Sequence, residues 1–126
     1  MVSVTTKTVT FDLTQTPLRE VNRYLHHLSP SDQEMIQILN PDGAHNIAVG
    51  LDAPVGVEIL GHAGYYAASM NQSANITIAG NVGTGVAENM MSGRVHVKGF
   101  ASVSAGASAH GGLLIIDGNA SLRCGI

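Results

Sequence analysis

The stretch GNVGTGVAENMMSG, residues 80–93, is where residue types and spacing first suggest chemistry. Gly83 and Gly85 precede Glu88 and give part of a phosphate-binding fingerprint, in which backbone N–H groups of a glycine-rich loop hold phosphate at the start of a helix. Glu88 stands where a dinucleotide-binding loop needs its third glycine. A nucleotide site would also be one special segment, whereas this glycine spacing recurs along the chain. We therefore favour a structural interpretation.

Histidine and cysteine are the next candidates for chemistry. His62, His96 and His110 occupy three different positions of the repeat described below. Neither an H-E-x-x-H motif nor paired cysteines accompany them, so we expect no metal site. Cys124, the only cysteine, aligns with small apolar residues of the other repeats. This favours a buried, unreactive side chain over a nucleophile, and we expect no catalytic residue here.

Two adjacent tyrosines, Tyr65 and Tyr66, are two of the three in the chain. They either pack in the core beneath an N-terminal helix or contact a partner, and the core interpretation is favoured. Ile115 stands where an outward side chain is expected and is the best single candidate for an interface residue. An alternative is an enzyme whose groove uses Tyr65, Tyr66, Glu88 and His110 to bind a sugar or an acid.

A period of 19 residues organises the chain from Val57 onward. Its rows are VEILGHAGYYAASMNQSAN, ITIAGNVGTGVAENMMSGR, VHVKGFASVSAGASAHGGL and the shorter LIIDGNASLRCGI. Unbroken self-similarity indicates stacked units, each too small to bury its own apolar face. Glycines in shared columns are expected at corners, where the backbone takes a positive φ or leaves no room for a Cβ. These structural corner residues are Gly61, Gly64, Gly80, Gly83, Gly99, Gly106, Gly118 and Gly125.

Apolar residues occupy every second position at the start of each row, as at Val57 and Ile59 or Ile76 and Ile78. This period is typical of a strand with one buried face. Two further short segments follow in each row, so we expect three short strands per coil. Stacked coils would pair each strand in parallel with its counterpart about 4.8 Å away. The predicted fold class is all-β, a parallel β-helix of 19-residue coils.

Residues 1–35 differ from the repeats and are expected to form a small cap of strand and helix before the β-helix at 36–126. A helix is predicted over 17–28, with Thr16 as its N-cap and Pro17 at the first helical position. His26 and His27 end this helix, where imidazole interacts favourably with the negative end of the helix dipole, so capping explains them.

Residues 29–33 suit one more helical turn. The turn NPDG at 40–43 is expected to separate short strands at 35–39 and 46–51. This region looks like a degenerate first coil, because Gly43 and Gly61 are one residue short of a full period apart.

Composition limits the function classes. The 126 residues are 44% hydrophobic but only 4% aromatic and 12% charged, so the core must be built of small side chains. A net charge of −3 with thinly spread Lys and Arg gives no basic face for nucleic acid or an anionic membrane. One cysteine rules out an internal disulfide. The start MVSVTTKTVT lacks the features of a signal peptide and no apolar run could span a membrane, so we expect a cytoplasmic protein.

The glycine spacing G-x-x-G-x-x-x-G, together with stretches such as GVAENMMSG and AGASAHGGL, resembles the GXGXG domain at the C-terminal end of the glutamate synthase large subunit. From about residue 10 onward, the chain looks most like the stand-alone version of that domain, the small subunit of N-methylglutamate synthase and of related glutamate synthase-like complexes. The resemblance implies a right-handed β-helix. Family members usually carry further coils, so we expect a truncated β-helix whose open C-terminal end allows self-association.

The resemblance also implies a non-catalytic, structural role in an oxidoreductase complex. In glutamate synthase an amidotransferase unit releases ammonia, a unit with FMN and an iron–sulfur cluster makes glutamate, and the β-helix lies between them. This chain would then carry no cofactor, and FMN and the iron–sulfur cluster would belong to partner subunits. One cysteine is too few to ligate such a cluster. A subunit of a formylmethanofuran dehydrogenase-like complex, from the same β-helix family, is an alternative, as is a fragment with no function alone.

Overall fold

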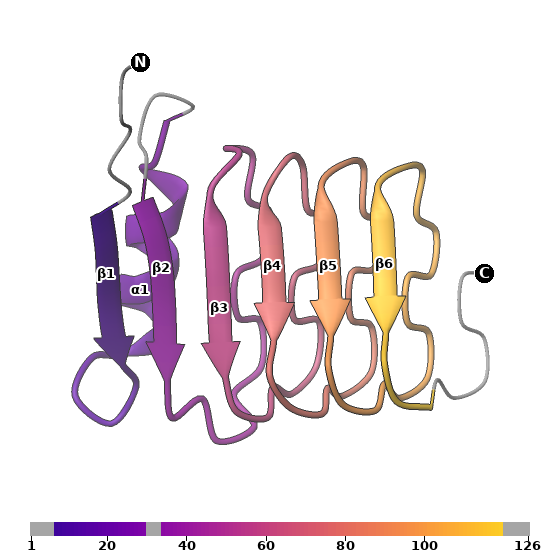
Figure 1. Ribbon diagram of the computed structural model, residues 1–126, viewed down its shortest axis with the longest axis horizontal. Helices are drawn as coiled ribbons and strands as arrows, with labels where there is room; N and C mark the ends of the chain where they lie inside the picture. The colour runs from indigo at the N-terminus through magenta and orange to yellow at the C-terminus, as the bar shows by residue number, and fades with distance from the viewer. Residues whose placement is uncertain (1–6, 30–33, 120–126) are drawn as a thin grey trace, which may run out of the picture.

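The computed structural model describes residues 7–29 and 34–119 and contains one parallel sheet. Its strands follow one another in chain order from one end of the molecule to the other (Figure 1). They are β1 (Lys7–Asp12), β2 (Glu34–Leu39), β3 (Gly56–Leu60), β4 (Asn75–Ile78), β5 (Arg94–Val97) and β6 (Leu113–Ile116), and α1 (Leu18–His26) connects β1 to β2. The predicted all-β fold of stacked parallel coils is confirmed.

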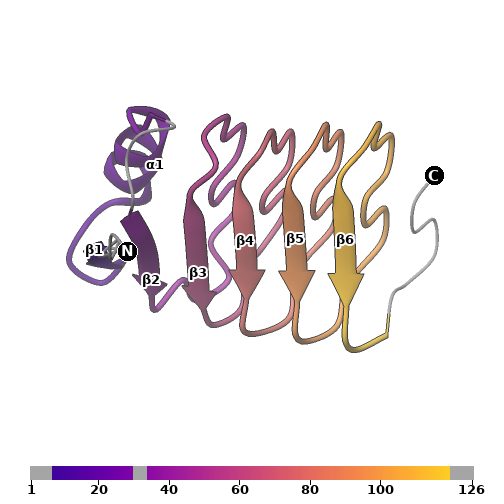
Figure 2. The ribbon, with the colours of Figure 1, turned by 45° about the horizontal axis from the view of Figure 1, so that its top comes forward.

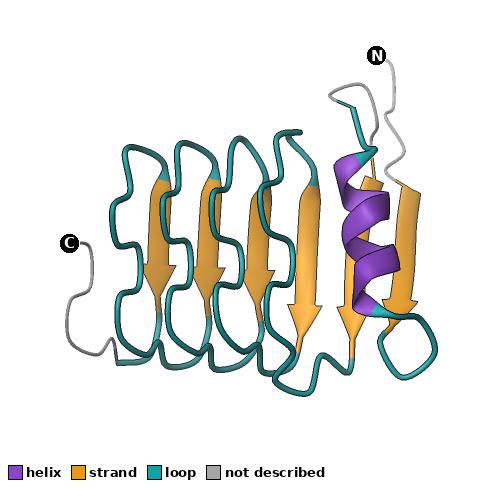
Figure 3. Ribbon diagram, turned by 180° about the vertical axis from the view of Figure 1, so that it is seen from behind, coloured by secondary structure: helices purple, strands orange, loops and turns teal. Residues whose placement is uncertain are grey.

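The later coils keep a constant length. Asn75 pairs with Arg94, and Arg94 pairs with Leu113, so each coil advances the chain by 19 residues. In Figure 1 the strands run downward in front, and Figure 3 shows the connecting segments on the opposite side of the sheet. Because each new strand lies to the right of the previous one, the coil is right-handed, the usual hand for parallel connections. The expected period and hand are both confirmed.

Inward side chains of successive strands lie in rows that form the core. One row contains Ile36, Val57, Ile76 and Val95, and the next contains Ile38, Ile59, Ile78 and Val97; all eight are buried. Alternating strand residues point to opposite faces, so the outer face of the sheet carries the row of Gln37, Glu58, Thr77, His96 and Ile115. Within the described residues, Asn71 is the buried side chain that keeps an unbonded polar atom, its Oδ1.

Each coil returns behind the sheet through a six-residue turn, here called a return segment. The return segments are residues 45–50, 65–70, 84–89 and 103–108. Every second residue in each of them has a left-handed backbone, with φ between 54° and 81°. These residues are Asn46, Ala48, Gly50, Tyr66, Ala68, Met70, Gly85, Ala87, Asn89, Ser104, Gly106 and Ser108. Left-handed residues do not occur inside regular strands, so these segments are stacked turns.

Two predictions about strands are therefore wrong. Residues 46–51 form turns where a strand was predicted, because Asn46, Ala48 and Gly50 are left-handed. Ile47 and Leu51 are nevertheless buried, so the apolar pattern of a strand is present without its conformation. Three strands per coil were also predicted. The coils between β3 and β6 each contain one strand, with isolated bridges linking Ala63, Val82 and Ala101.

The column glycines are explained mainly by close stacking of the coils. A Cβ on Gly80 would lie 2.5 Å from the carbonyl oxygen of Gly61, and a Cβ on Gly99 would lie 2.6 Å from that of Gly80. Gly118 meets Gly99 in the same way, at 2.6 Å. Real Cβ atoms do not approach a carbonyl so closely, so a side chain there would push two coils apart. A positive φ, the other expected reason, applies to Gly61 and Gly106.

The helix α1 lies on the same side of the sheet as the return segments (Figures 2 and 3). Lys7 on β1 pairs with Glu34 on β2, 27 residues later, because the helix occupies the return path of this first coil. Val21 and Leu25 are buried and anchor it to the core. The helix predicted over 17–28 is confirmed with shorter bounds. No helix in the described ranges is long and apolar enough to cross a membrane.

The start of α1 differs from the prediction. Pro17 occupies the N-cap position with an extended backbone, and no side chain caps the helix, so the prediction of Thr16 as N-cap is wrong. The carbonyl oxygen of Pro17 instead accepts hydrogen bonds from the amides of Glu20 and Val21, at 3.0 and 3.3 Å. The additional helical turn predicted over 29–33 falls mostly on residues 30–33, which lie outside the described residues.

Asn22 and His26 give α1 the hydrogen-bonding pattern of a return segment. The amides of Ala68, Ala87 and Gly106 each donate to a carbonyl of the preceding coil. Ala48, at the same position of the first return segment, donates instead to Asn22 Oδ1 at 3.0 Å. His26 Nε2 lies 2.8 Å from the Val49 carbonyl oxygen. In later coils the equivalent carbonyl oxygen, as at Ser69, accepts a hydrogen bond from an amide of the preceding return segment. One helical turn separates Asn22 from His26, so one face of α1 caps the stack.

Candidate functional site

Polar side chains near the corners link each coil to the next. The amide of Asn81 donates to His62 Nδ1 at 2.8 Å, and the amide of Phe100 donates to Asn81 Oδ1 at 2.8 Å. The amide of Tyr65 likewise donates to His45 Nδ1 at 2.7 Å. A ring nitrogen that accepts a hydrogen bond carries no proton, which assigns both histidines the tautomer with hydrogen on Nε2. These side chains have a structural task.

Tyr65 stacks on the preceding coil. Its ring is 4.5 Å from the His45 ring, centroid to centroid, with 23° between their planes. The absence of side chains at two glycines makes this possible. A Cβ on Gly64 would lie 2.2 Å from His45 Nδ1, and a Cβ on Gly83 would lie 2.9 Å from the Tyr65 ring. Tyr65 thus lies along the surface across neighbouring coils.

Tyr66 packs across the following coil. A Cβ on Gly85 would lie 2.5 Å from the Tyr66 ring, so this glycine leaves the space that the ring occupies. Tyr65 and Tyr66 are 53% and 45% exposed, and the preferred interpretation of the pair as core residues is therefore wrong. Their participation in an interface stays a prediction.

A hollow of about 230 Å³ opens beside Tyr66 on the return side of the coils. Its lining includes Tyr66, Met70, Glu88 and Asn89. Glu88 is half-buried, and its carboxylate makes no hydrogen bond or ion pair with any described residue. The alternative of a groove enzyme built from Tyr65, Tyr66, Glu88 and His110 is not assembled in this hollow, because Tyr65 and His110 are absent from its lining.

The backbone of the segment around Glu88 argues against the phosphate-loop alternative. Residues 80–93 form turns and a single bridge, and none of them is helical. The dipole and free amides of a helix N-terminus, on which phosphate loops depend, are therefore missing. The amides of Gly83, Gly85 and Ala87 instead donate to carbonyls of neighbouring coils.

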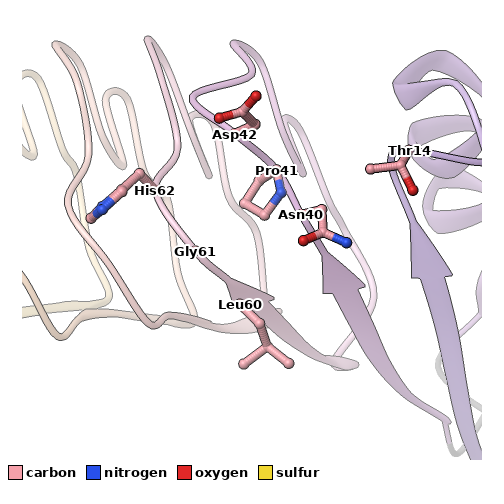
Figure 4. Close-up of a pocket in the computed structure, with 7 residues that line it drawn as sticks. All are labelled: Thr14, Asn40, Pro41, Asp42, Leu60, Gly61 and His62. Atoms are coloured by element: carbon pink, nitrogen blue, oxygen red, sulfur yellow. The ribbon is translucent and has the colours of Figure 1, made fainter.

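A second hollow, of about 340 Å³, lies where β2 and β3 end (Figure 4). Thr14, Asn40, Asp42 and His62 line it from the segments that follow β1, β2 and β3. The Asn40 side-chain amide, the Thr14 backbone amide and the Thr14 hydroxyl all donate to Asp12 Oδ1, at distances of 2.7 to 3.0 Å. These bonds hold the pKa of the Asp12 carboxyl below its ordinary value of 3.8. Most polar groups here connect segments of backbone, and no acid and base are paired for proton transfer.

The remaining histidines do not form one site. His96 Nε2 lies 3.0 Å from Asp117 Oδ2 on the outer face of the sheet, whereas His110 is exposed at the corner before β6. His62 is engaged with Asn81. In residues 7–29 and 34–119, no three His, Cys, Asp or Glu side chains are grouped so that they could hold a metal ion.

Both histidines at the end of α1 have specific partners. His27 Nδ1 lies 2.7 Å from the Arg23 carbonyl oxygen, which fits the predicted capping role. His26 instead reaches the Val49 carbonyl, so capping does not explain it. Ile115 pairs with His96 across the outer face and is half-buried. Its predicted interface role stays a prediction, and Cys124 and Gly125 lie outside the described residues.

Sequence reasoning missed the hydrogen-bonding roles of Asn22, Asn81 and His45. Asn81 falls in the column after the repeated glycine, which could have suggested a role in stacking. Asn22 carries no such signal, because its task depends on where the helix docks.

Comparison with known proteins gives a similarity to "Protein GlxC" of Rhizobium meliloti (strain 1021). The two sequences are 52% identical over 80 residues, which amount to 63% of this chain and 35% of that protein. The chain thus matches about a third of the length of its curated relative. No family model matches the sequence, and no solved structure matches it significantly. What the comparisons establish is this partial similarity to Protein GlxC.

Proposed function

We propose that this chain is a non-catalytic, structural subunit or domain of a glutamate synthase-like complex, related to N-methylglutamate synthase. In this role the β-solenoid holds an amidotransferase unit and a synthase unit at a fixed separation. The proposal rests on the glycine pattern that the chain shares with the GXGXG domain, together with the stacked coils that this pattern builds.

The use of polar side chains supports a structural role over catalysis. His45, His62 and Asn81 accept backbone hydrogen bonds between coils, and Asn22 and His26 fasten the helix to the stack. Catalysis needs a nucleophile and a base, or an acid and a base, within hydrogen-bonding reach of one another. Around the hollow at Asp42 and His62, the side chains of Thr14, Asn40 and His62 instead bond neighbouring segments of the chain.

The expected cofactors belong to other units in this proposal. A cluster is commonly held by four cysteines, and the chain has one. The described residues offer no group of three metal ligands either. FMN and an iron–sulfur cluster are therefore assigned to the synthase partner, and the amidotransferase is a second partner.

Co-purification tests the proposal. An affinity tag on the native protein, at its chromosomal locus, should recover an amidotransferase-like and a flavin-containing protein, identified by mass spectrometry and by the flavin absorption spectrum. A tagged Gly80→Val variant, in which the coils cannot close, is the matched control and should recover neither. Recovery of the wild-type chain as a lone monomer would contradict the proposal. So would an enzymatic activity of the isolated chain that Glu88→Ala abolishes.

A further inference from the structure

The hollow beside Tyr66 interrupts the repeat. In the column of Tyr66 the other return segments carry Asn46, Gly85 and Ser104, and in the column of Glu88 they carry Val49, Ser69 and Ala107. The third large side chain, Met70, shares its column with Gly50, Asn89 and Ser108. A stack whose other return segments carry smaller side chains at these positions thus carries an aromatic ring, a carboxylate and a thioether side by side. Departures from a repeat mark positions selected for something other than stacking.

Gly85 joins these side chains into one pocket. A Cβ there would lie 2.5 Å from the Tyr66 ring and 2.9 Å from Glu88 Oε2, so the glycine brings both groups to the same spot. Met70 lies on the rim and is 50% exposed. The ring and the carboxylate come from adjacent coils that the backbone holds together, because the amide of Met70 donates to the Glu88 carbonyl oxygen at 2.7 Å. The pocket is therefore preformed.

The chemistry of the lining selects a cation. None of the lining residues is positively charged, and the Glu88 carboxylate has no counter-ion among the described residues. An aromatic face attracts cations, and a planar guanidinium can stack on a ring while its N–H fork bonds a carboxylate. The Asn89 side chain, also in the lining, offers a further acceptor. The volume of about 230 Å³ is below the usual range of small-molecule sites and suits the end of one side chain.

We propose that this pocket receives an arginine side chain of a partner protein, with the guanidinium on the Tyr66 ring and against the Glu88 carboxylate. The inference does not depend on which complex the chain joins, because it follows from the pocket alone. Its test uses the isolated full chain, so a failure here leaves the proposed complex untouched, and the reverse also holds.

The test is an NMR titration of the isotope-labelled chain with three probes: N-acetyl-arginine amide, N-acetyl-lysine amide and the neutral isostere N-acetyl-citrulline amide. The arginine probe should give saturable shifts at Tyr66, Glu88 and Asn89, with a dissociation constant on the order of millimolar. The lysine probe should bind more weakly, and the citrulline probe should not bind.

Matched variants identify the groups responsible. Glu88→Gln keeps the shape of the side chain and should weaken arginine binding about three- to tenfold. Tyr66→Asn installs the residue of the same column in the first return segment and should abolish the ring contribution without straining the backbone. Glu58→Gln, on the opposite face of the coils, should leave binding unchanged. Absence of saturable shifts, equal binding of all three probes, or full binding by Glu88→Gln would overturn the proposal.

Discussion

A hydrogen bond joins Asn22 on the helix to Ala48 on the first return segment, at the position where a backbone hydrogen bond joins one coil to the next elsewhere in the stack. The Ala48 amide donates to Asn22 Oδ1 at 3.0 Å, in the position where Ala68 donates to the Ile47 carbonyl oxygen at 2.9 Å. A second bond, from Asn22 Nδ2 to the Asn46 carbonyl oxygen, is 2.9 Å long. One amide side chain thus supplies the acceptor that a preceding return segment would provide and donates a further bond to the same turn.

Replacing Asn22 by Ala should lower the free energy of unfolding by about 1–3 kcal/mol, because the Ala48 amide, buried in the core, loses its acceptor. Urea denaturation followed by circular dichroism measures the change. Arg19→Ala, at an exposed position of the same helix, is the control and should change stability by less than about 0.5 kcal/mol. Equal effects of the two substitutions would show that Asn22 does not cap the stack.

Replacing Gly80 by Ala should be strongly destabilising, by about 2 kcal/mol or more. The new Cβ would lie 2.5 Å from the Gly61 carbonyl oxygen, and relief would require two coils to separate. Ala79→Ser, at the exposed neighbouring position, should cost less than about 0.5 kcal/mol. Urea denaturation of both variants compares them directly, and a Gly80→Ala protein as stable as the wild type would be incompatible with the close contact.

The stacked strands could be predicted from the sequence, because the 19-residue repeat of glycines and apolar pairs is itself a record of the stacking. The return segments could not. Ile47 and Leu51 are buried as in a strand, although Asn46, Ala48 and Gly50 have a left-handed backbone. The pattern of apolar residues shows which side chains are buried but does not predict the backbone angle φ.

The candidate pocket was only partly predictable for a related reason. Glu88 stands out in the sequence, but only through two alternatives to the structural interpretation, a phosphate loop and a groove enzyme. Its proximity to Tyr66 depends on the side chain that Gly85 lacks and on contact between two coils. Single-residue patterns do not encode which side chains meet across coils. Exposure of Tyr65 and Tyr66 was likewise missed, because aromatic residues are more often buried.

His62 and Asn81 each accept a backbone hydrogen bond from the following coil, and this predicts which substitutions of His62 are tolerated. His62→Asn should keep stability within about 0.5 kcal/mol, since Asn81 performs the same task one coil later through its Oδ1. His62→Leu removes the acceptor for the Asn81 amide and should cost about 1 kcal/mol. Thermal or urea denaturation separates the two cases. Equal stability of the Asn and Leu variants would mean that the bond contributes nothing.

Asp12 should make stability depend on pH. Its carboxylate accepts bonds from Asn40 and Thr14, which hold its pKa below 3.8 in the folded chain. A lowered pKa in the folded state contributes stability that is present above the unfolded value and is lost as pH falls through the folded value. Urea midpoints measured from about pH 5 to pH 2 should therefore fall more steeply for the wild type than for Asp12→Asn, which keeps an acceptor oxygen but does not titrate. Parallel curves would contradict this role.

Disulfide trapping tests the central claim, that each 19-residue coil places equivalent residues side by side. Asn75 and Arg94 are exposed partners on β4 and β5, so cysteines at both positions should have Cα atoms about 4.8 Å apart, within disulfide range. In a Cys124→Ala background, this pair should close under mild oxidation, as measured by mass spectrometry. Cysteines at Asn75 and His96, two residues out of register, should stay reduced. Closure of the second pair in preference to the first would contradict the stacked-coil account.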